Sequence, residues 1–280
     1  ISSGFDSIDE SHTYNSGDKY NIKILAIDEN EKSSNQTINI IAKGFAGGSG
    51  TENDPYLVEN AFQLDYVREN LSAHFKQIAD IDLSNYDNWE PIGKWYGEGY
   101  GENEALTGSF DGNDFKILNL KIEKNNENRI GLFKIIETGK ITNITLQNVN
   151  ISGDNYVGGI VGRIEEGEII NASVNGKING NSNVGGIAGI NTKSASILKS
   201  STDLILKAYS SGGGLVGIND EGKIKNSFSK SKVSGDSSIG GLVGSNTGSS
   251  RNIEIKKSYA LGNVNGNSNV GGLVGKNTTF

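Results

Sequence analysis

The chain has 280 residues, of which 34% are hydrophobic, and its formal net charge at pH 7 is −7. The acidic balance argues against nucleic-acid binding, because neutralising phosphates requires clusters of Lys and Arg that this sequence lacks. The chain contains no cysteine, which excludes disulfides and zinc–thiolate sites. No apolar run approaches the ~18 residues of a membrane-spanning helix, so we expect no direct membrane insertion.

Residues 1–44 differ in pattern from the rest of the chain. Apolar and polar residues alternate over residues 20–26, and a polar turn separates them from a second apolar stretch at residues 37–42. Such alternation predicts two β-strands. Together with the tripeptide that begins at His12, the segment resembles the C-terminal half of a PKD-type immunoglobulin-like domain. His12 is then a structural residue of that motif, and the alternative is a metal ligand.

Residues 45–107 predict a linker followed by a cap. Three glycines in six residues indicate a linker at residues 45–50. Apolar residues four apart then predict a helix over residues 59–71, with Asn60 as its N-cap. Because exposed strand edges invite pairing with other chains, we assign this helix and a strand at residues 75–83 to an N-terminal cap of a solenoid.

An irregular stretch within this cap, residues 84–107, holds both tryptophans of the chain. Aromatic rings alternate with glycines and carboxylates at residues 95–102, a composition suited to stacking on sugar rings with polar contacts to hydroxyls. The alternative is a loop folded over the cap, with its rings half buried. The candidate ligand-binding residues are Trp95, Tyr96, Glu98, Tyr100 and Glu102.

The remainder, residues 108–280, is organised by a repeated motif, Gly-Gly-[Ile/Leu]-[Val/Ala]-Gly. Successive copies start 27, 28, 27 and 31 residues apart, at Gly158, Gly185, Gly213, Gly240 and Gly271. A fixed period of this size indicates a repeat architecture. Short bursts of period-two alternation between Gly, Asn and Ser predict short strands, not helices. The sequence therefore predicts an all-β fold, a right-handed parallel β-helix with one turn of ~27 residues per repeat.

Fixed spacing from the double glycines aligns the apolar residues in columns. An isoleucine lies 16 residues before four of the motifs, and Ile141 and Ile117 are placed in the same column of two earlier, less regular units: Ile117, Ile141, Ile169, Ile197, Ile224, Ile255. Two further columns follow: Ile122, Leu146, Val174, Thr202, Ser229, Ala260; and Ile151, Ile178, Leu206, Val233, Val264. We expect each column to be buried in the solenoid.

Asparagines and glycines recur at fixed positions as well. One column holds Asn119, Asn143, Asn171 and Asn226 and is interrupted by Lys199 and Lys257. Asparagine tolerates left-handed turns and can hydrogen-bond along a stack, so we expect an internal ladder; the alternative is a surface turn. The double glycines are expected where a Cβ would clash with the next turn or where φ is positive. A phosphate-binding loop is the alternative, but no Lys-Ser/Thr follows.

The motif resembles the GLUG repeat of bacterial surface proteins, which occurs in large adhesin-like proteins and in the non-catalytic region of immunoglobulin-A-cleaving zinc metalloproteases. Residues 48–58, 75–84, 89–93 and 108–113 follow in the order usual for that family, so the resemblance covers roughly residues 47–280. It implies a β-helix at a cell surface. The chain opens abruptly and closes inside a repeat, which leads us to expect a longer parent protein.

Candidate catalytic groups are few. The zinc-protease signature His-Glu-x-x-His is absent, and the only histidines are His12 and His74. A polysaccharide-cleaving β-helix would need carboxylates that converge on one face. Glu166 and Glu221 precede equivalent glycines and are expected to be solvated turn residues, with calcium binding as the alternative. We expect no cofactor.

The sequence therefore predicts a non-catalytic extracellular module of a bacterial surface protein, located at the cell surface or associated with the cell wall. Its role would be that of an adhesin, a stalk or a ligand-display scaffold, with a glycan or an extracellular protein of the host or environment as partner. One alternative is an accessory region of a secreted surface metalloprotease. Another alternative is a polysaccharide-degrading enzyme.

Overall fold

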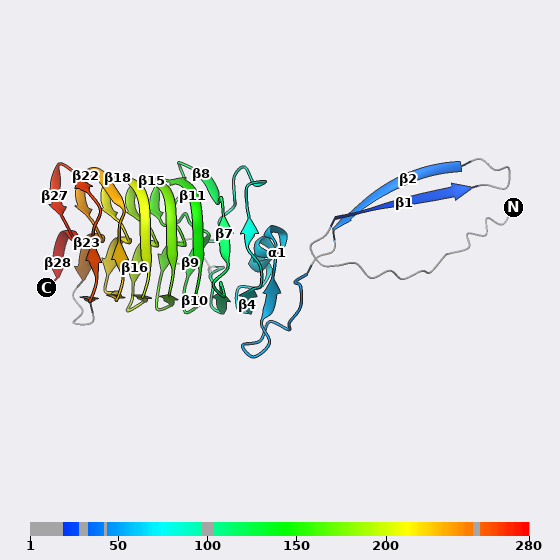
Figure 1. The fold of residues 1–280 in the computed structure, drawn as a ribbon, viewed down its shortest axis with the longest axis horizontal. Helices are drawn as coiled ribbons and strands as arrows, with labels where there is room; N and C mark the ends of the chain where they lie inside the picture. The colour runs from blue at the N-terminus through cyan, green and yellow to red at the C-terminus, as the bar shows by residue number, and fades with distance from the viewer. Residues whose placement is uncertain (1–18, 28–32, 42–43, 97–103, 249–252, 280) are drawn as a thin grey trace.

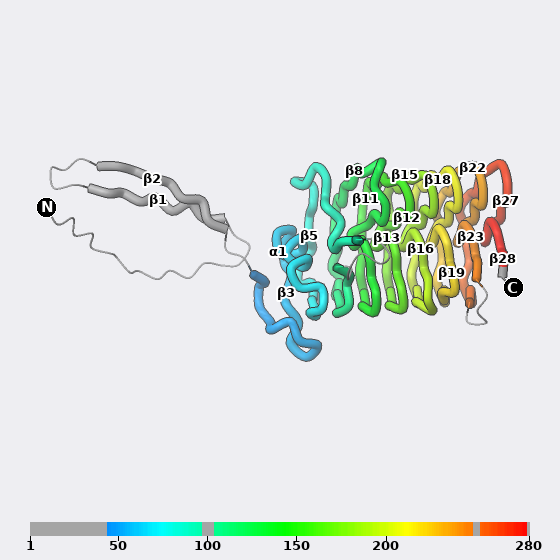
Figure 2. The backbone as a smooth tube through the Cα atoms, turned by 180° about the vertical axis from the view of Figure 1, so that it is seen from behind, coloured from blue at the N-terminus to red at the C-terminus, as the bar shows by residue number. Residues whose placement is uncertain are grey.

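The structure is a computed structural model that describes residues 19–27, 33–41, 44–96, 104–248 and 253–279. The described residues from Gly44 onward wind into a parallel β-solenoid of about six turns, stacked along one axis (Figure 1). Seen from behind, the strands of successive turns again lie next to one another (Figure 2). The prediction of an all-β fold built as a parallel β-helix is therefore confirmed.

Three parallel sheets line the solenoid in the described part of the chain. The first, here the short-strand sheet, contains β3 (Tyr56–Val58), β4 (His74–Gln77), β6 (Ser109–Asp111), β10 (Lys140–Thr142), β14 (Glu168–Ile170), β17 (Ser196–Leu198), β20 (Lys223–Lys225) and β24 (Glu254–Lys256). The second, here the motif sheet, follows the glycine motifs and contains β9 (Phe133–Ile136), β13 (Val161–Ile164), β16 (Ala188–Thr192), β19 (Val216–Asp220), β23 (Val243–Gly248) and β28 (Val274–Thr279).

The third, here the long-strand sheet, contains the longest strands of the solenoid. Its members are β5 (Ile81–Asp82), β7 (Lys116–Leu118), β8 (Lys121–Lys124), β11 (Thr145–Gly153), β12 (Asn155–Val157), β15 (Ser173–Gly185), β18 (Ser201–Gly213), β21 (Phe228–Ser229), β22 (Lys232–Gly240), β25 (Tyr259–Ala260), β26 (Val264–Asn265) and β27 (Ser268–Gly271). Backbone hydrogen bonds between turns satisfy the N–H and C=O groups of these strands.

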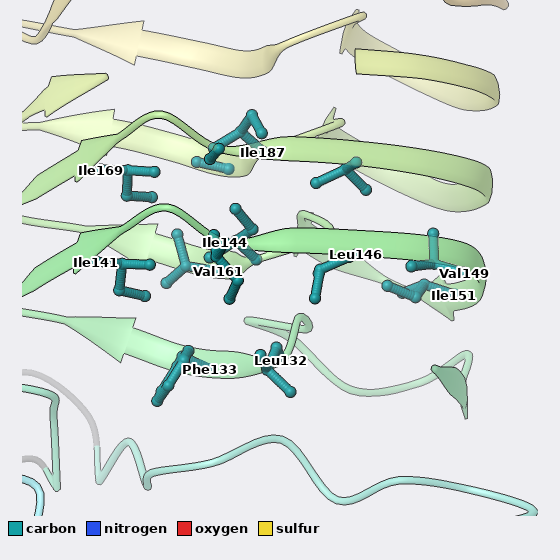
Figure 3. Close-up of a cluster of buried hydrophobic side chains, with 14 of the residues drawn as sticks. Leu132, Phe133, Ile141, Ile144, Leu146, Val149, Ile151, Val161, Ile169 and Ile187 are labelled. Atoms are coloured by element: carbon teal, nitrogen blue, oxygen red, sulfur yellow. The ribbon is translucent and has the colours of Figure 1, made fainter. Parts of the chain in front are cut away.

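The predicted isoleucine column is continuous from the second unit onward. Ile141, Ile169, Ile197, Ile224 and Ile255 pair in register from strand to strand. The first four have no exposed surface, and the last is partly buried. Figure 3 shows two neighbouring members of the column, one above the other, among the other buried side chains. Burying such a side chain contributes about 1.5–3 kcal/mol, so each turn is held by the next.

The predicted columns are wrong for the earliest units. Phe110, not Ile117, precedes the isoleucine column. Ile117 pairs instead with Leu146, and Ile122 pairs with Ile151. These early units have no double glycine from which positions could be counted. Alternation of apolar and polar residues alone cannot align them, because a strand shifted by two residues shows the same pattern. The later column from Ile151 to Val264 is confirmed.

The predicted asparagine column lies at the surface, so its assignment as an internal ladder was wrong. Asn143 and Asn171 adopt left-handed turns, with φ of 50° and 57°, and Asn171 Nδ2 donates to Asn143 Oδ1 at 2.8 Å. Asn171 is nevertheless exposed. Asn119 belongs to another stack, where its Nδ2 donates to Asp82 Oδ1 at 2.8 Å.

A different set of asparagines forms the internal ladder, on the motif sheet. Each follows the first glycine of its motif by six residues: Asn191, Asn219, Asn246, Asn277. Each side-chain nitrogen donates to the oxygen of the next asparagine, at 2.7, 2.8 and 2.8 Å in chain order. The first three side chains are buried. In the preceding turn Ile164 takes this position, and Asn191 Oδ1 accepts no hydrogen bond from any described residue.

The double glycines are required by close packing between turns, as predicted. A Cβ on Gly213 would run into the backbone nitrogen of Gly244 in the next turn and the backbone oxygen of Val216 in its own turn. A Cβ on Gly214 would meet the side chain of Ser229 and the backbone oxygen of Gly241. Neither glycine has a positive φ, so the requirement here is space and not backbone conformation.

The N-terminal end of the solenoid is covered by a short helix, α1 (Ala61–Tyr66), and the 3₁₀ turn η1 (Val67–Glu69) that follows it. Asn60 caps α1 as predicted, since its side chain accepts a hydrogen bond from the Gln63 backbone at 3.0 Å. Leu64 and Val67 are fully buried against the first turns. The helix is shorter than the predicted range of residues 59–71. Trp89 is only 1% exposed, so this tryptophan packs in the core.

Strands β1 (Lys19–Ile27) and β2 (Ser33–Ile41) form an antiparallel pair in the N-terminal part of the chain. They agree with the two strands predicted from alternation. The assignment of this segment to a PKD-type domain stays a prediction, and His12 lies outside the described residues.

Candidate functional site

The two ends of the predicted aromatic loop are held together by hydrogen bonds where the loop leaves the cap. The backbone N–H groups of Lys94 and Glu104 each donate to the other residue's carbonyl oxygen, at 2.8 and 3.0 Å. Tyr96 Oη donates to the Glu104 carboxylate at 2.7 Å, and Lys94 Nζ donates to it at 3.0 Å. These hydrogen bonds, from Tyr96 and then Lys94, lower the pKa of Glu104. The base of the loop therefore carries an ionised carboxylate at neutral pH.

Trp95 lies against two arginines of the solenoid wall. The guanidinium of Arg129 is 4.0 Å from the centre of the Trp95 ring, and that of Arg163 is 5.6 Å away. Arg129 is also 5.3 Å from the ring of Tyr156. Cations over aromatic rings stabilise by about 0.5–2 kcal/mol, so this cluster attaches the start of the loop to the wall.

Arg163 also takes part in a buried ion cluster. The Glu165 carboxylate accepts hydrogen bonds from Arg163 and from Lys193, and its residue is only 6% exposed. Burial acts to raise the pKa of Glu165, but the hydrogen bonds from Lys193 and Arg163 outweigh it and hold the pKa below the usual value. The carboxylate is therefore ionised and fully engaged at neutral pH, which makes it a structural group.

The structure places two of the five candidate ligand-binding residues. Trp95 is half-buried and Tyr96 is 47% exposed. Glu98, Tyr100 and Glu102 lie outside the described residues. The half-buried Trp95 agrees with the alternative of a loop folded against the molecule, whereas Tyr96 keeps about half of its surface exposed.

A polar groove of about 1000 Å³ opens beside the base of the loop. Its walls include Arg68, Lys94, Thr107, Glu104 and Glu137. Groups of both charges line it, so it suits a ligand that presents many hydrogen-bonding groups rather than one strong charge. The groove and the exposed Tyr96 ring together make up the candidate site.

The turn carboxylates do not assemble a further site in the described structure. Glu166 and Glu221 both adopt left-handed conformations, with φ of 33° and 64°, and of the two predicted solvated turn residues Glu166 is exposed and Glu221 is half-buried. Among the described residues, no three His, Cys, Asp or Glu side chains gather closely enough to hold a metal ion. Calcium binding at these turns thus has no geometric support there.

The arginines around Trp95 were missed by sequence reasoning. Arg129 and Arg163 come 34 and 68 residues after Trp95, and only the stacking of turns brings all three together. The available signal was Arg163, an arginine directly after the first double-glycine motif, at a position that Ile190, Ile218 and Ser245 fill in later repeats.

Comparison with known proteins identifies the class of the repeat. Residues 153–179, which span one turn from the end of β11 into β15, match the family described as "The GLUG motif". Among solved structures, IgA1 protease has the same fold over 93% of this chain and 24% of its own, with a TM-score of 0.50 and 16% identity. The chain therefore contains a GLUG-motif region folded as a parallel β-solenoid, which confirms the resemblance drawn from the sequence.

Two curated relatives share sequence with about half of this chain. Halomucin of Haloquadratum walsbyi is 36% identical over 148 residues, which cover 51% of this chain and 2% of halomucin. The "Putative Gly-rich membrane protein" of Evansella cellulosilytica is 36% identical over 190 residues, which cover 52% of this chain and 21% of the relative. The match thus involves a small share of both relatives. No helix among the described residues is long and apolar enough to cross a membrane.

Proposed function

We propose that this chain is a non-catalytic extracellular module of a microbial surface protein, which acts as a rigid stalk or ligand-display scaffold. The observation that carries the proposal is the unbroken register of the solenoid. From Phe110 to Ile255 one column continues in register through every turn, fully buried as far as Ile224, and each turn adds about 4.8 Å of length. Such an architecture holds distant surfaces at a fixed separation.

The names of related proteins support an extracellular location for this chain. One relative is named as a Gly-rich membrane protein, and the structural neighbour is an IgA1 protease. The second name also keeps open the alternative of an accessory, non-catalytic region of a secreted surface protease. In either case the solenoid acts as a scaffold, and any catalytic activity belongs to another part of the parent protein.

Two measurements test this proposal. An antibody raised against the chain should label intact cells of the source organism, and brief treatment with external protease should remove the label. Label that appears only after the cells are permeabilised would contradict the extracellular location. Prolonged incubation of the purified chain with a panel of polysaccharides should release no new reducing ends, whereas release would favour the polysaccharide-degrading alternative.

A second candidate function is ligand binding at the loop base. The exposed Tyr96 ring beside the polar groove favours a glycan or an extracellular protein as the partner. A screen against glycans and matrix proteins should find a ligand whose affinity falls about tenfold or more in Tyr96→Ala. Tyr96→Phe keeps the ring but loses the hydrogen bond to Glu104, and it should retain most of the affinity. Equal affinity in wild type and Tyr96→Ala would exclude this ring as the contact.

A further inference from the structure

A column that contains three lysines runs along the outer face of the long-strand sheet. Its five members pair in register on successive strands: Lys121, Asn150, Lys177, Ile205, Lys232. The next residue on each strand is buried in the solenoid, so these five side chains point outward. They belong to β8, β11, β15, β18 and β22, which follow one another along the solenoid in Figure 1. The set is here called the lysine column.

The cations of the lysine column recur on every second turn. The neutral residues Asn150 and Ile205 occupy the turns between Lys121, Lys177 and Lys232. Strands of neighbouring turns lie about 4.8 Å apart, so the interval between successive lysines is about 9.6 Å at their Cα atoms. The column therefore presents evenly spaced positive charges with an uncharged position between each pair.

The lysines of the column are available to an anion. Lys177 and Lys232 are exposed, and neither ammonium group has an ion-pair or hydrogen-bond partner among the described residues. Lys121 Nζ is 3.6 Å from the Glu123 carboxylate, but these side chains are 40% and 55% exposed. Such an exposed pair contributes little, so a carboxylate of a ligand can replace Glu123.

A groove of about 520 Å³ extends along the first part of the column. Its lining includes four successive members of the column: Lys121, Asn150, Lys177, Ile205. Among the described residues that line the groove, Asp87 is the one carboxylate, so positive charge exceeds negative charge there. The 46% exposed side chain of Ile205 adds an apolar contact, and Asn150 adds an amide. The groove thus suits an elongated ligand with separated negative charges.

The interval between the lysines matches the repeat of a linear acidic polysaccharide. In an extended β-linked chain each sugar ring advances by about one strand spacing, so a disaccharide advances by about the interval between two lysines. Neighbouring rings are turned over relative to each other, so carboxylates on every second ring point to the same side. Nucleic acid fits less well, because each strand of a duplex carries a phosphate about every 3.4 Å and the net charge of −7 opposes so dense a polyanion.

We propose that the lysine column binds a linear polysaccharide that has one carboxylate per disaccharide and lies along the solenoid axis. Carboxylates of every second sugar pair with Lys121, Lys177 and Lys232. The neutral sugars between them lie over Asn150, whose amide meets polar substituents, and over Ile205, which contacts C–H groups. Each exposed ion pair is weak, so the affinity comes from engaging several at once. This inference goes beyond the proposed scaffold function, and the residues of the column do not line the groove beside the aromatic loop.

Isothermal titration calorimetry of the whole chain at low ionic strength tests the proposal. The probe is a hyaluronan hexasaccharide, in which glucuronate alternates with a neutral amino sugar, and the control is chitohexaose, a neutral β-linked chain of equal length. We expect saturable binding of the hyaluronan hexasaccharide and at least about tenfold weaker binding of chitohexaose. Salt at about 1 M, where the Debye length is about 3 Å, should abolish the binding. Absence of binding, equal binding of both glycans, or tighter binding of a short DNA duplex would overturn the proposal.

A double variant tests the spacing of the charges. Lys177→Ile combined with Ile205→Lys keeps the composition and the net charge but breaks the two-turn interval, so it should weaken hyaluronan binding at least about fivefold. Both positions are exposed, so the melting temperature should stay near that of wild type. Equal affinity of this variant and wild type would show that only the total charge matters, and it would refute the site.

A triple variant tests the lysines themselves. Lys121→Gln, Lys177→Gln and Lys232→Gln together should weaken hyaluronan binding at least about tenfold. The matched control removes the same charge from three exposed lysines outside the column and should bind nearly as wild type: Lys140→Gln, Lys199→Gln, Lys257→Gln. Equal losses in the two triple variants would refute the column as the site. The assay uses purified protein, so its failure leaves the cell-surface proposal intact.

Discussion

The side-chain nitrogen of Asn219 donates a hydrogen bond to the side-chain oxygen of Asn246, 2.8 Å away and one turn further along the solenoid. Both side chains are buried in the motif sheet. Asn219 also accepts from Asn191 at 2.7 Å and donates to the Gly222 backbone at 3.0 Å. A buried amide with this many partners fixes the register of three turns at once, because a slip would strand polar groups in the core.

We expect Asn219→Ala to lower the free energy of unfolding by about 2–4 kcal/mol, because it leaves buried groups of Asn191 and Asn246 without partners. Urea denaturation of variant and wild type measures the difference. Asn181→Ala is the control, since that side chain is exposed and makes one hydrogen bond, to Asp154 at 3.1 Å. It should change stability by less than about 0.5 kcal/mol. Similar effects of the two substitutions would mean that the buried ladder adds nothing specific.

Two glycines at the same position of the motif should respond differently to an added methyl group. Gly214→Ala should destabilise by about 1–3 kcal/mol or more, since its Cβ would collide with Ser229 and with the Gly241 backbone. Gly272→Ala should stay within about 0.5 kcal/mol of wild type, because no heavy atom lies within 4 Å of the added Cβ. Thermal melts of both variants provide the comparison. Equal loss in both would show that backbone freedom, and not packing between turns, explains the motif.

Isoleucines of the column should contribute less to the free energy of unfolding toward its exposed end. Ile224→Ala should cost roughly 2–5 kcal/mol, as expected for a fully buried side chain between two turns. Ile255→Ala should cost clearly less, because that residue is only partly buried. The denaturation midpoints of the two variants test this order. A cost below half a kcal/mol for Ile224→Ala would contradict its place in the core.

The buried carboxylate of Glu165 should make the free energy of unfolding depend on pH in the acidic range. Its folded-state pKa is lowered, so its contribution is complete above the unfolded pKa of about 4.3 and disappears as the pH falls through the folded value. Glu165→Gln should therefore be less stable than wild type at pH 7, and the difference should shrink as the pH falls below the unfolded pKa and through the lowered folded one. Urea midpoints between pH 7 and pH 3 measure this.

The control for this experiment is Glu168→Gln. The Glu168 carboxylate forms an exposed ion pair with Lys140 at 3.6 Å, so its removal should change stability by less than about 0.5 kcal/mol at pH 7. If the gap between wild type and Glu165→Gln is the same at every pH, then the cluster acts through packing and not through its charge.

The sequence was sufficient to predict which residues pair in the later turns, because each position can be counted from a double glycine. The pairing of Ile197 with Ile224 followed directly from equal spacing to the motif. Before Ile141 no motif marks the phase, and Phe110 was therefore overlooked. The buried asparagine ladder could not be predicted from residue type, because asparagine occupies both exposed left-handed turns, such as that of Asn171, and the buried ladder at Asn219.

The candidate sites were less predictable than the fold. The composition of residues 95–102 indicated an aromatic loop, but its attachment to Arg129 depends on which turns become neighbours. The lysine column likewise joins residues of successive turns that belong to no recognisable motif. Periodicity predicts which residues point inward, whereas a surface site depends on the residues that break the period.

The one long repeat has a consequence for how such a solenoid can change in evolution. Twelve positions separate Val243 from Ile255, where eight separate Val216 from Ile224, yet both pairs keep their register with the neighbouring turns. The four additional residues thus fall between Val243 and Ile255 in sequence and leave the hydrogen-bonded column undisturbed. The chain between these two strands can therefore change in length while the number of stacked turns stays the same, which makes it a natural point for grafting a foreign peptide.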